Sequence, residues 1–177
     1  MNILVRGKPG ASTGTLTFGA KTIPCALGRS GIISDSEKRE GDGATPAGTW
    51  PLRRILYRQD RLNKPITDLV TMPIGPTDGW CDDPSDALYN KPTELPYSAS
   101  AENLWREDEL YNVCVILGHN DEPVMPHKGS AIFFHVAKER GGRLCATEGC
   151  VAIPQNTILH ILTSCGPGTT MRIELQK

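Results

Sequence analysis

A histidine and a cysteine fifteen positions apart are the residues of this chain best suited to chemistry. His135 lies near the end of the apolar run 131–136, and Cys150 directly follows Gly149. A free thiol has a pKa near ~8.5, so a neighbouring imidazole that accepts its proton raises the fraction of reactive thiolate. A base, a nucleophile and free backbone N–H groups together are typical of cysteine acyl transfer. We therefore predict that Cys150 is the nucleophile and His135 its general base.

The segments around this pair must orient both side chains. If residues 131–136 form a strand, His135 shares one face with Ala131 and Phe133, and the alternate residues anchor the core on the other face. The carbonyl of Val136, or of a nearby loop residue, can fix the imidazole tautomer. Gly149 allows a substrate carbonyl to approach the amides of residues 149 and 150, which would form an oxyanion hole. A helix soon after Cys150 would add its dipole if the geometry brings the two together.

The rest of the chain predicts one mainly β domain over residues 1–177. Its 177 residues can bury one sizeable core, and 18 glycines and 14 prolines favour many short strands over a helical bundle. We expect a β-sandwich or β-barrel-like architecture with one or two short helices. The clearest patterns predict strands at 15–18, 21–27, 50–57, 113–117 and 171–175, and helices at 100–105 and 154–164.

Composition argues against several partners. The formal net charge of −1 and the pI near 6.4 leave no electrostatic footprint for nucleic acid or an anionic membrane. No apolar run approaches the ~20 residues that span a bilayer. The apolar stretch at the N-terminus is too short for the core of a secretory signal, which leaves cytoplasmic residence open.

Of the six cysteines, we expect Cys25, Cys114 and Cys165 to be buried thiols, and Cys145 is the most plausible disulfide partner of Cys150.

Several motifs resemble one known family. His135, a spacer of fourteen residues, and then Thr147, Gly149, Cys150 and an apolar residue resemble the catalytic signature of the L,D-transpeptidase (YkuD-type) domain of bacterial cell-wall enzymes. The block 41–50, which contains Thr-Pro-Ala-Gly, resembles the Thr-Pro-x-Gly segment that precedes the catalytic strand in that family. Agreement extends through 79–83, 88–90 and 129–133. The resemblance covers residues 20 to 175 approximately.

This resemblance implies the fold, the substrate and the location. Cys150 would attack an L-centre carbonyl of a peptidoglycan stem peptide, hold the acyl group as a thioester and pass it to an amine of a second stem, without metal or organic cofactor. The periplasm or cell envelope would be the compartment. Candidate substrate contacts, several of which could equally serve packing, are Trp80, Tyr89, Asn90, Trp105, Arg106, Tyr111, His119, Asn120, Arg140, Arg143, Thr147 and Glu148.

Two positions depart from the family pattern. Many members carry His in place of Glu148, and Asn or Arg in place of Ala152. A carboxylate that faced Cys150 would raise the pKa of the thiol, so we expect Glu148 to point elsewhere or to contact substrate.

We also expect the long segments 71–97 and 119–128 to form walls of the cleft, and Lys38, Arg39 and Glu40 to form a solvated face.

Three other functions compete with this interpretation. A cysteine hydrolase acting on the same stem peptides would use water in place of the acceptor amine. A structural zinc module would use His127, His135, Cys145 and Cys150, although their spacings differ from the usual zinc patterns. An inactive wall-binding domain is the third, and the intact cysteine and histidine pair argues against it.

Overall fold

A closed β-barrel forms the body of the molecule. The computed structural model describes residues 2–176, in which sixteen strands and one α-helix are found. The mainly β expectation is therefore confirmed, in its barrel form. The barrel consists of β1 (Asn2–Gly7), β2 (Thr13–Phe18), β3 (Lys21–Ala26), β6 (Gly48–Tyr57), β11 (Val113–Leu117), β12 (Phe133–Val136), β15 (Val151–Ile153) and β16 (Thr170–Leu175).

The long strand β6 closes the barrel by pairing with two different neighbours. Its first half, Gly48–Pro51, is antiparallel to β16, and its second half, from Leu52 to Tyr57, is antiparallel to β11. The order β11-β12-β15-β3-β2-β1-β16-β6 thus returns to β11. A short strand, β7 (Thr71–Pro73), adds in parallel to the end of β6.

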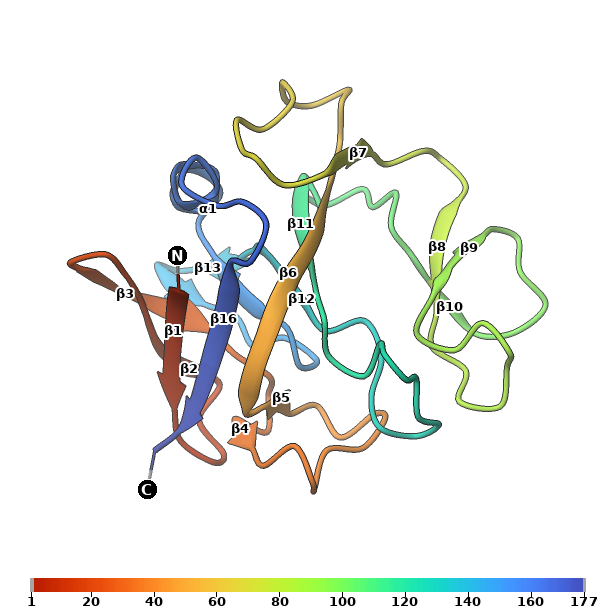
Figure 1. The fold of residues 1–177 in the computed structure, drawn as a ribbon, viewed down its shortest axis with the longest axis horizontal. Helices are drawn as coiled ribbons and strands as arrows, with labels where there is room; N and C mark the ends of the chain where they lie inside the picture. The colour runs from red at the N-terminus through yellow and green to blue at the C-terminus, as the bar shows by residue number, and fades with distance from the viewer. Residues whose placement is uncertain (1, 177) are drawn as a thin grey trace.

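Three small sheets and one helix surround the barrel. The order β10-β8-β9 makes a sheet of β8 (Asp78–Cys81), β9 (Pro92–Glu94) and β10 (Ala101–Asn103), which stands to one side of the barrel in Figure 1. The predicted helix at 100–105 is therefore wrong, because pairing with β8 holds residues 101–103 in a strand. The remaining elements are β4 (Ile32–Ile33) with β5 (Thr45–Pro46), β13 (Glu139–Arg140) with β14 (Arg143–Leu144), and α1 (Gln155–Leu162).

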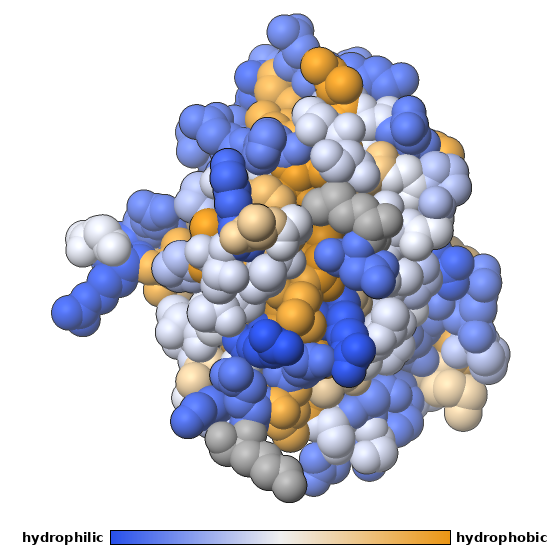
Figure 2. Space-filling model, turned by 60° about the vertical axis from the view of Figure 1, so that its left-hand side comes forward, coloured by the Kyte–Doolittle hydropathy of each residue, from blue (hydrophilic) through white to orange (hydrophobic). Residues whose placement is uncertain are grey.

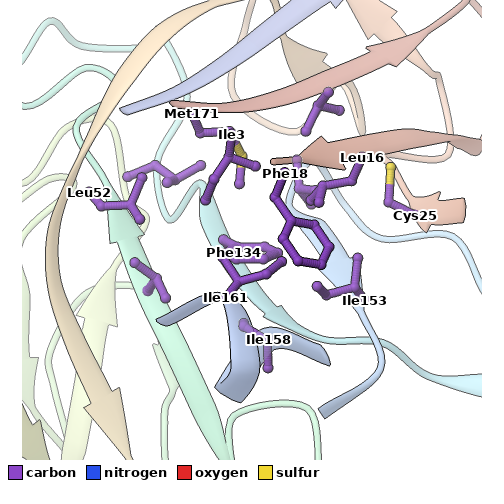
Figure 3. Packing of buried hydrophobic residues seen from close by; sticks show 14 of the residues in the cluster. Ile3, Leu16, Phe18, Cys25, Leu52, Phe134, Ile153, Ile158, Ile161 and Met171 are labelled. Atoms are coloured by element: carbon purple, nitrogen blue, oxygen red, sulfur yellow. The ribbon is translucent and has the colours of Figure 1, made fainter. Parts of the chain in front are cut away.

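The barrel core gathers around Phe134 on β12. This side chain is fully buried and lies among Ile153, Ile161 and the apolar side chains of the N-terminal strands (Figure 3). Helix α1, whose existence confirms the predicted 154–164 helix, contributes Ile158, Ile161 and Leu162 to this core. Burying each such side chain is worth about 1.5–3 kcal/mol, so the strand that carries His135 is firmly anchored.

The outer face of β11 and β12 packs into a second cluster. Phe133 lies on the face opposite Phe134 and contacts Trp80 and Tyr111 edge to face, with ring centroids 5.2 and 5.9 Å apart. Cys114 and Cys150 belong to the same cluster. The predicted alternation along residues 131–136 is confirmed: Ile132, Phe134 and Val136 face the barrel core, while Ala131 and Phe133 face the second cluster.

Within residues 2–176, no helix is long and apolar enough to cross a bilayer. On the face drawn in Figure 2, hydrophilic side chains prevail at the edges and apolar ones show as a broken band through the middle. The largest exposed apolar side chains are Ile66, Val70, Met72, Leu88, Met125 and Leu175.

Candidate active site

The Cys150 thiol is held by the backbone of the neighbouring strand segment. Its Sγ donates to the Ala131 carbonyl at 3.2 Å and accepts the Phe133 N–H at 3.3 Å. Cys150 directly precedes β15, whose parallel register with β12 pairs Val151 with Phe134. The sulfur therefore meets the same strand that carries His135.

The His135 ring is buried and its tautomer is fixed. Nδ1 lies 2.8 Å from the Val136 carbonyl oxygen, which can only accept a hydrogen bond, so Nδ1 carries the proton and Nε2 the free lone pair. This is the contact that the expected orienting role of the Val136 carbonyl requires. The ring of Tyr111 packs edge to face against the imidazole at 5.3 Å between centroids. His135 and Cys150 line the same cavity.

Burial keeps both groups neutral in the resting protein. Desolvation lowers the pKa of His135 to about 4, against a smaller opposite effect of the hydrogen bond to Val136. Desolvation, with the charge of Glu102 second, raises the pKa of Cys150 to about 12, while the Phe133 N–H and Lys38 act to lower it. The thiol hydrogen bond to Ala131 agrees with a protonated sulfur.

The loop of residues 147–150, which we call the nucleophile loop, is shaped by Thr147 and Gly149. The Thr147 hydroxyl donates to the Cys150 carbonyl at 2.6 Å and accepts the Gly149 N–H at 3.2 Å. Gly149 has φ of +143°, and a Cβ there would lie 2.9 Å from the Ala44 carbonyl oxygen. Because its amide is engaged by Thr147, Gly149 does not offer the free N–H that we expected for an oxyanion hole. The Cys150 amide has no acceptor among the described residues and remains available.

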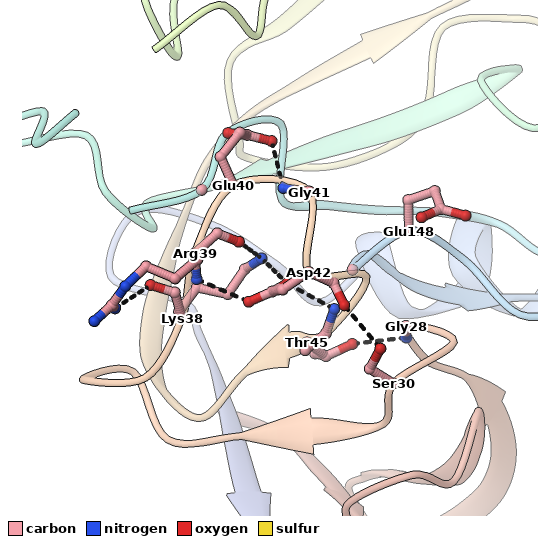
Figure 4. Close-up of polar contacts among 12 residues, drawn as sticks. Gly28, Ser30, Lys38, Arg39, Glu40, Gly41, Asp42, Thr45 and Glu148 are labelled. Carbon is pink, nitrogen blue, oxygen red and sulfur yellow. Dashed lines mark hydrogen bonds and ion pairs between the residues drawn. The ribbon is translucent and has the colours of Figure 1, made fainter. Parts of the chain in front are cut away.

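The segment 28–45 packs against the nucleophile loop, and its hydrogen bonds are organised by Asp42 (Figure 4). The Asp42 carboxylate accepts the Ala44 N–H and the Arg39 N–H, both at 2.8 Å, and pairs with Lys38 Nζ at 2.5 Å. These bonds place the Ala44 carbonyl against Gly149. The 41–50 block of the resemblance thus braces the nucleophile loop.

Lys38 corrects one expectation. The run 38–40 was predicted to be a solvated face, but Lys38 is only 2% exposed and lines the cavity with Cys150. Glu40 is half-buried, and its carboxylate accepts the hydroxyls of Tyr89 and Ser130. Only Arg39 of the three is exposed. The ion pair with Asp42 compensates the buried charge of Lys38. A run of charged residues in the sequence does not reveal this contact.

The cleft has a volume of about 510 Å³ and contains four of the predicted contact residues. Arg106 and Tyr111 form one wall, and Thr147 and Glu148 lie on the nucleophile loop. The Glu148 side chain is 80% exposed and pairs with Arg29 at 2.9 Å. It therefore points away from the thiol, as expected, and its charge comes last among the causes of the Cys150 pKa shift.

The segment 71–97 holds three predicted contacts that lie outside this cleft. Trp80 is buried behind Phe133, and its indole N–H donates to Asn90 at 3.0 Å. Asn90 also accepts the Ala131 N–H at 3.0 Å. Tyr89 is buried against Glu40 and the Gly129 amide. Of this segment, only Asp82 lines the Cys150 cleft. The segment therefore mainly supports residues 129–133, which lead into β12.

The other predicted contacts are also placed elsewhere. His119 is buried against Asp35 at 3.2 Å, and Asn120 bonds within its own loop, so the segment 119–128 does not line the cleft. Trp105 stacks under the Arg58 guanidinium at 3.6 Å. Arg140 and Arg143 are exposed on the β13–β14 hairpin, outside the cleft.

Helix α1 does not support the nucleophile in the way its position in sequence suggested. Strand β15 separates it from Cys150, and a strand of three residues spans roughly 10 Å. A helix dipole acts mainly within the first turn. The packing of α1 on β12 and β11 also places its buried residues in the barrel core.

No metal site or disulfide involves the cleft residues. Across residues 2–176, no group of three or more His, Cys, Asp or Glu side chains is placed to hold a metal ion, which leaves the zinc alternative without support. All six cysteines are free thiols. Cys25, Cys114 and Cys165 are buried as expected, and Cys145 lines the cleft beside Cys150.

Five charged cleft residues were not predicted from the sequence as contacts. They are Lys38, Glu40, Asp82, Glu102 and Lys138. Asp82 lies in the 79–83 block of the resemblance, which marked the segment but not this side chain. Glu102 lies on β10, in a stretch expected to be helical, so its sequence context gave no signal.

A cysteine and a histidine that line one cleft are residues that cysteine-dependent enzymes use as nucleophile and base. A family model for the L,D-transpeptidase catalytic domain (YkuD) matches residues 13–173, and the chain belongs to this family. The family is cysteine-dependent, acts on peptidoglycan and is typically associated with the cell envelope. No curated protein and no solved structure gave a significant match.

Proposed function

We propose that this protein is a peptidoglycan L,D-transpeptidase of the cell envelope, which joins two stem peptides through a thioester on Cys150. The observation that carries the proposal is the shared cleft of Cys150 and His135, with the Phe133 N–H on the sulfur and the Val136 carbonyl on Nδ1. The family membership supplies the substrate class.

In the first half-reaction the donor stem peptide displaces water from the cleft. His135 Nε2 takes the thiol proton as Cys150 attacks the donor carbonyl, and the Phe133 N–H stabilises charge on the sulfur. The Cys150 amide donates to the developing oxyanion. The tetrahedral intermediate then expels the leaving amine, which receives the proton from His135. The acyl group remains on the sulfur as a thioester.

In the second half-reaction an amine of another stem peptide attacks the thioester. The new amide bond forms and the Cys150 thiol is regenerated. Holding the acceptor in the cleft makes this step effectively unimolecular, which favours the amine over water. Water as the second nucleophile would give a hydrolase, the alternative outcome.

The test is product analysis with purified stem-peptide fragments as donor and acceptor. Mass spectrometry should show a cross-linked dimer whose yield rises with acceptor concentration. Accumulation of trimmed monomers alone, even at high acceptor concentration, would replace the transferase with a hydrolase.

The nucleophile itself is tested with a carbapenem-type β-lactam, whose strained carbonyl mimics the acyl donor. Cys150→Ala should lose the covalent adduct and retain the fold. Cys145→Ala is the matched control, since Cys145 lines the same cleft, and it should retain the adduct. An adduct that persists in Cys150→Ala or maps to Cys145 would refute the assignment.

A further inference from the structure

We propose that Glu102 binds the ammonium group of the acceptor stem peptide and takes its proton, which makes the amine nucleophilic toward the thioester on Cys150. This inference rests on the proposed transferase function and adds a third catalytic residue to Cys150 and His135.

The position of Glu102 is set by the small sheet beside the barrel. On β10 it pairs with Trp80 of β8, and its side chain lines the same cavity as Cys150 and His135. Tyr111 donates its hydroxyl to Glu102 Oε1 at 2.5 Å, and the Tyr111 ring packs against His135. One carboxylate oxygen is therefore fixed. The other accepts no hydrogen bond from the described residues, although the side chain keeps 27% of its surface accessible.

The negative charge of Glu102 is only weakly compensated. Arg106 Nη1 is 3.9 Å away, but the same guanidinium makes two hydrogen bonds of 2.8 and 2.7 Å to Asp108. Asp82 lines the same cavity and has a buried carboxylate oxygen without a hydrogen-bond partner. Lys38, also in the cleft, is paired with Asp42, and Lys138, which lines the same cavity, is exposed to solvent. This side of the cleft therefore favours a cation that can donate hydrogen bonds, such as a primary ammonium.

The carboxylate opposes the first half-reaction, which indicates a use in the second. After desolvation, the charge of Glu102 is the largest influence that raises the pKa of Cys150, so it disfavours thiolate formation. Once Cys150 is acylated the sulfur is uncharged and this cost disappears. The same charge then attracts the acceptor. Burial, with Asp82 acting in the same direction, raises the pKa of Glu102 against the lowering effects of Tyr111 and Arg106, which makes it a stronger base.

The proton balance of the step is complete. The ammonium gives one proton to Glu102, and the neutral amine attacks the thioester carbonyl. The C–N bond forms, the C–S bond breaks, and a second proton moves from nitrogen through His135 to the Cys150 sulfur. Glu102 then releases its proton to solvent. One ammonium and one thioester thus give one amide, one thiol and one proton.

The test is Glu102→Gln, which keeps the shape and the acceptor for Tyr111 but removes the charge. Acylation by the carbapenem and by the donor stem should be unchanged or faster. Transfer to the acceptor amine at neutral pH should fall by about 10²-fold, the lower end of general acid–base effects. The preformed acyl-enzyme should partition to hydrolysis, and transfer should recover as the pH approaches the pKa of the acceptor amine. Glu109→Gln, which removes an exposed carboxylate outside the cleft, should match the wild type.

The outcomes separate this inference from the proposed function. Wild-type cross-linking with unchanged partition in Glu102→Gln would overturn the role of Glu102 alone. Loss of acylation in this variant would also overturn it, because the residue would then serve the first half-reaction or the fold. A wild type that only trims stem peptides would overturn both proposals.

Discussion

Asn90 joins the small sheet to the catalytic strand, and its replacement should destabilise the protein strongly. The side-chain oxygen accepts the Trp80 indole N–H and the Ala131 amide, both at 3.0 Å, and the amide donates to the carbonyls of His119 at 3.1 Å and Asn120 at 2.8 Å. Asn90 is 7% exposed, so the released groups cannot all reach water. At about 1 kcal/mol for each hydrogen bond, Asn90→Ala should lower the free energy of unfolding by about 4 kcal/mol.

The backbone at Asn90 adds a second, separable effect. Its φ of 56° is left-handed, a conformation that costs a residue with a Cβ roughly 1–2 kcal/mol. Asn90→Gly loses the same four hydrogen bonds as Asn90→Ala. Because glycine has no Cβ, it does not incur the cost of the left-handed backbone conformation that alanine incurs. The glycine variant should therefore be more stable than the alanine variant by about 1 kcal/mol, the reverse of the usual order in helices and strands.

Urea unfolding followed by linear extrapolation measures both differences. A loss below about 1 kcal/mol for Asn90→Ala would show that water replaces the four bonds and that the residue is not a structural link. An alanine variant at least as stable as the glycine variant would refute the backbone argument, whatever the total loss.

The remaining predictions concern the two buried histidines. His135→Ala should slow alkylation of Cys150 by iodoacetamide near neutral pH by at least about 10²-fold and move its pH dependence upward, whereas the exposed His127→Ala should not; an unchanged Cys150 titration would reassign the base. Burial lowers the pKa of His135 to about 4 and that of His119 likewise to about 4. Because the unfolded chain binds these protons near pH 6.5 and the native state does not, stability should be full above pH 6.5 and fall toward pH 4 by up to about 1.4 kcal/mol per pH unit per histidine. Urea unfolding at pH 7, 6 and 5 tests this, and a flat profile would contradict it; His135→Ala should remove its share of the slope.

The candidate pair Cys150 and His135 and the periodic elements could be predicted from the sequence because both are local patterns. The alternation along 131–136 placed His135 and Phe134 on opposite faces correctly, and the apolar stripe from Ile158 to Cys165 identified α1. The Val136 carbonyl could be proposed because it is adjacent to His135 in the chain.

The walls of the cleft depend on long-range contacts, and only four of the predicted contact residues line it. Trp80 and Asn90 have the chemistry of binding residues, but Trp80 packs edge to face against Phe133, and Asn90 is used in hydrogen bonds to the Trp80 indole and to the backbone of residues 119, 120 and 131. Lys38 has the sequence context of a solvated charge, but its ion pair with Asp42 allows it to be buried. Glu102 enters the site only because β10 adds to β8, a pairing between segments about twenty residues apart. Residue type suggested contact, but tertiary pairing decided it.

The parallel register of β12 and β15 has a consequence for how this family can diverge. The proposed base lies on β12 and the proposed nucleophile directly precedes β15, two positions out of register with His135, so the pairing of these two strands sets their separation. The connection between them, which includes the exposed β13–β14 hairpin, does not set that separation. Insertions or deletions at the hairpin tip, Gly141-Gly142, would therefore leave the reacting groups in place. The hairpin adjoins Lys138 and Cys145, which line the cleft, so a change in its length would alter the surroundings of the cleft and leave the barrel strands unchanged.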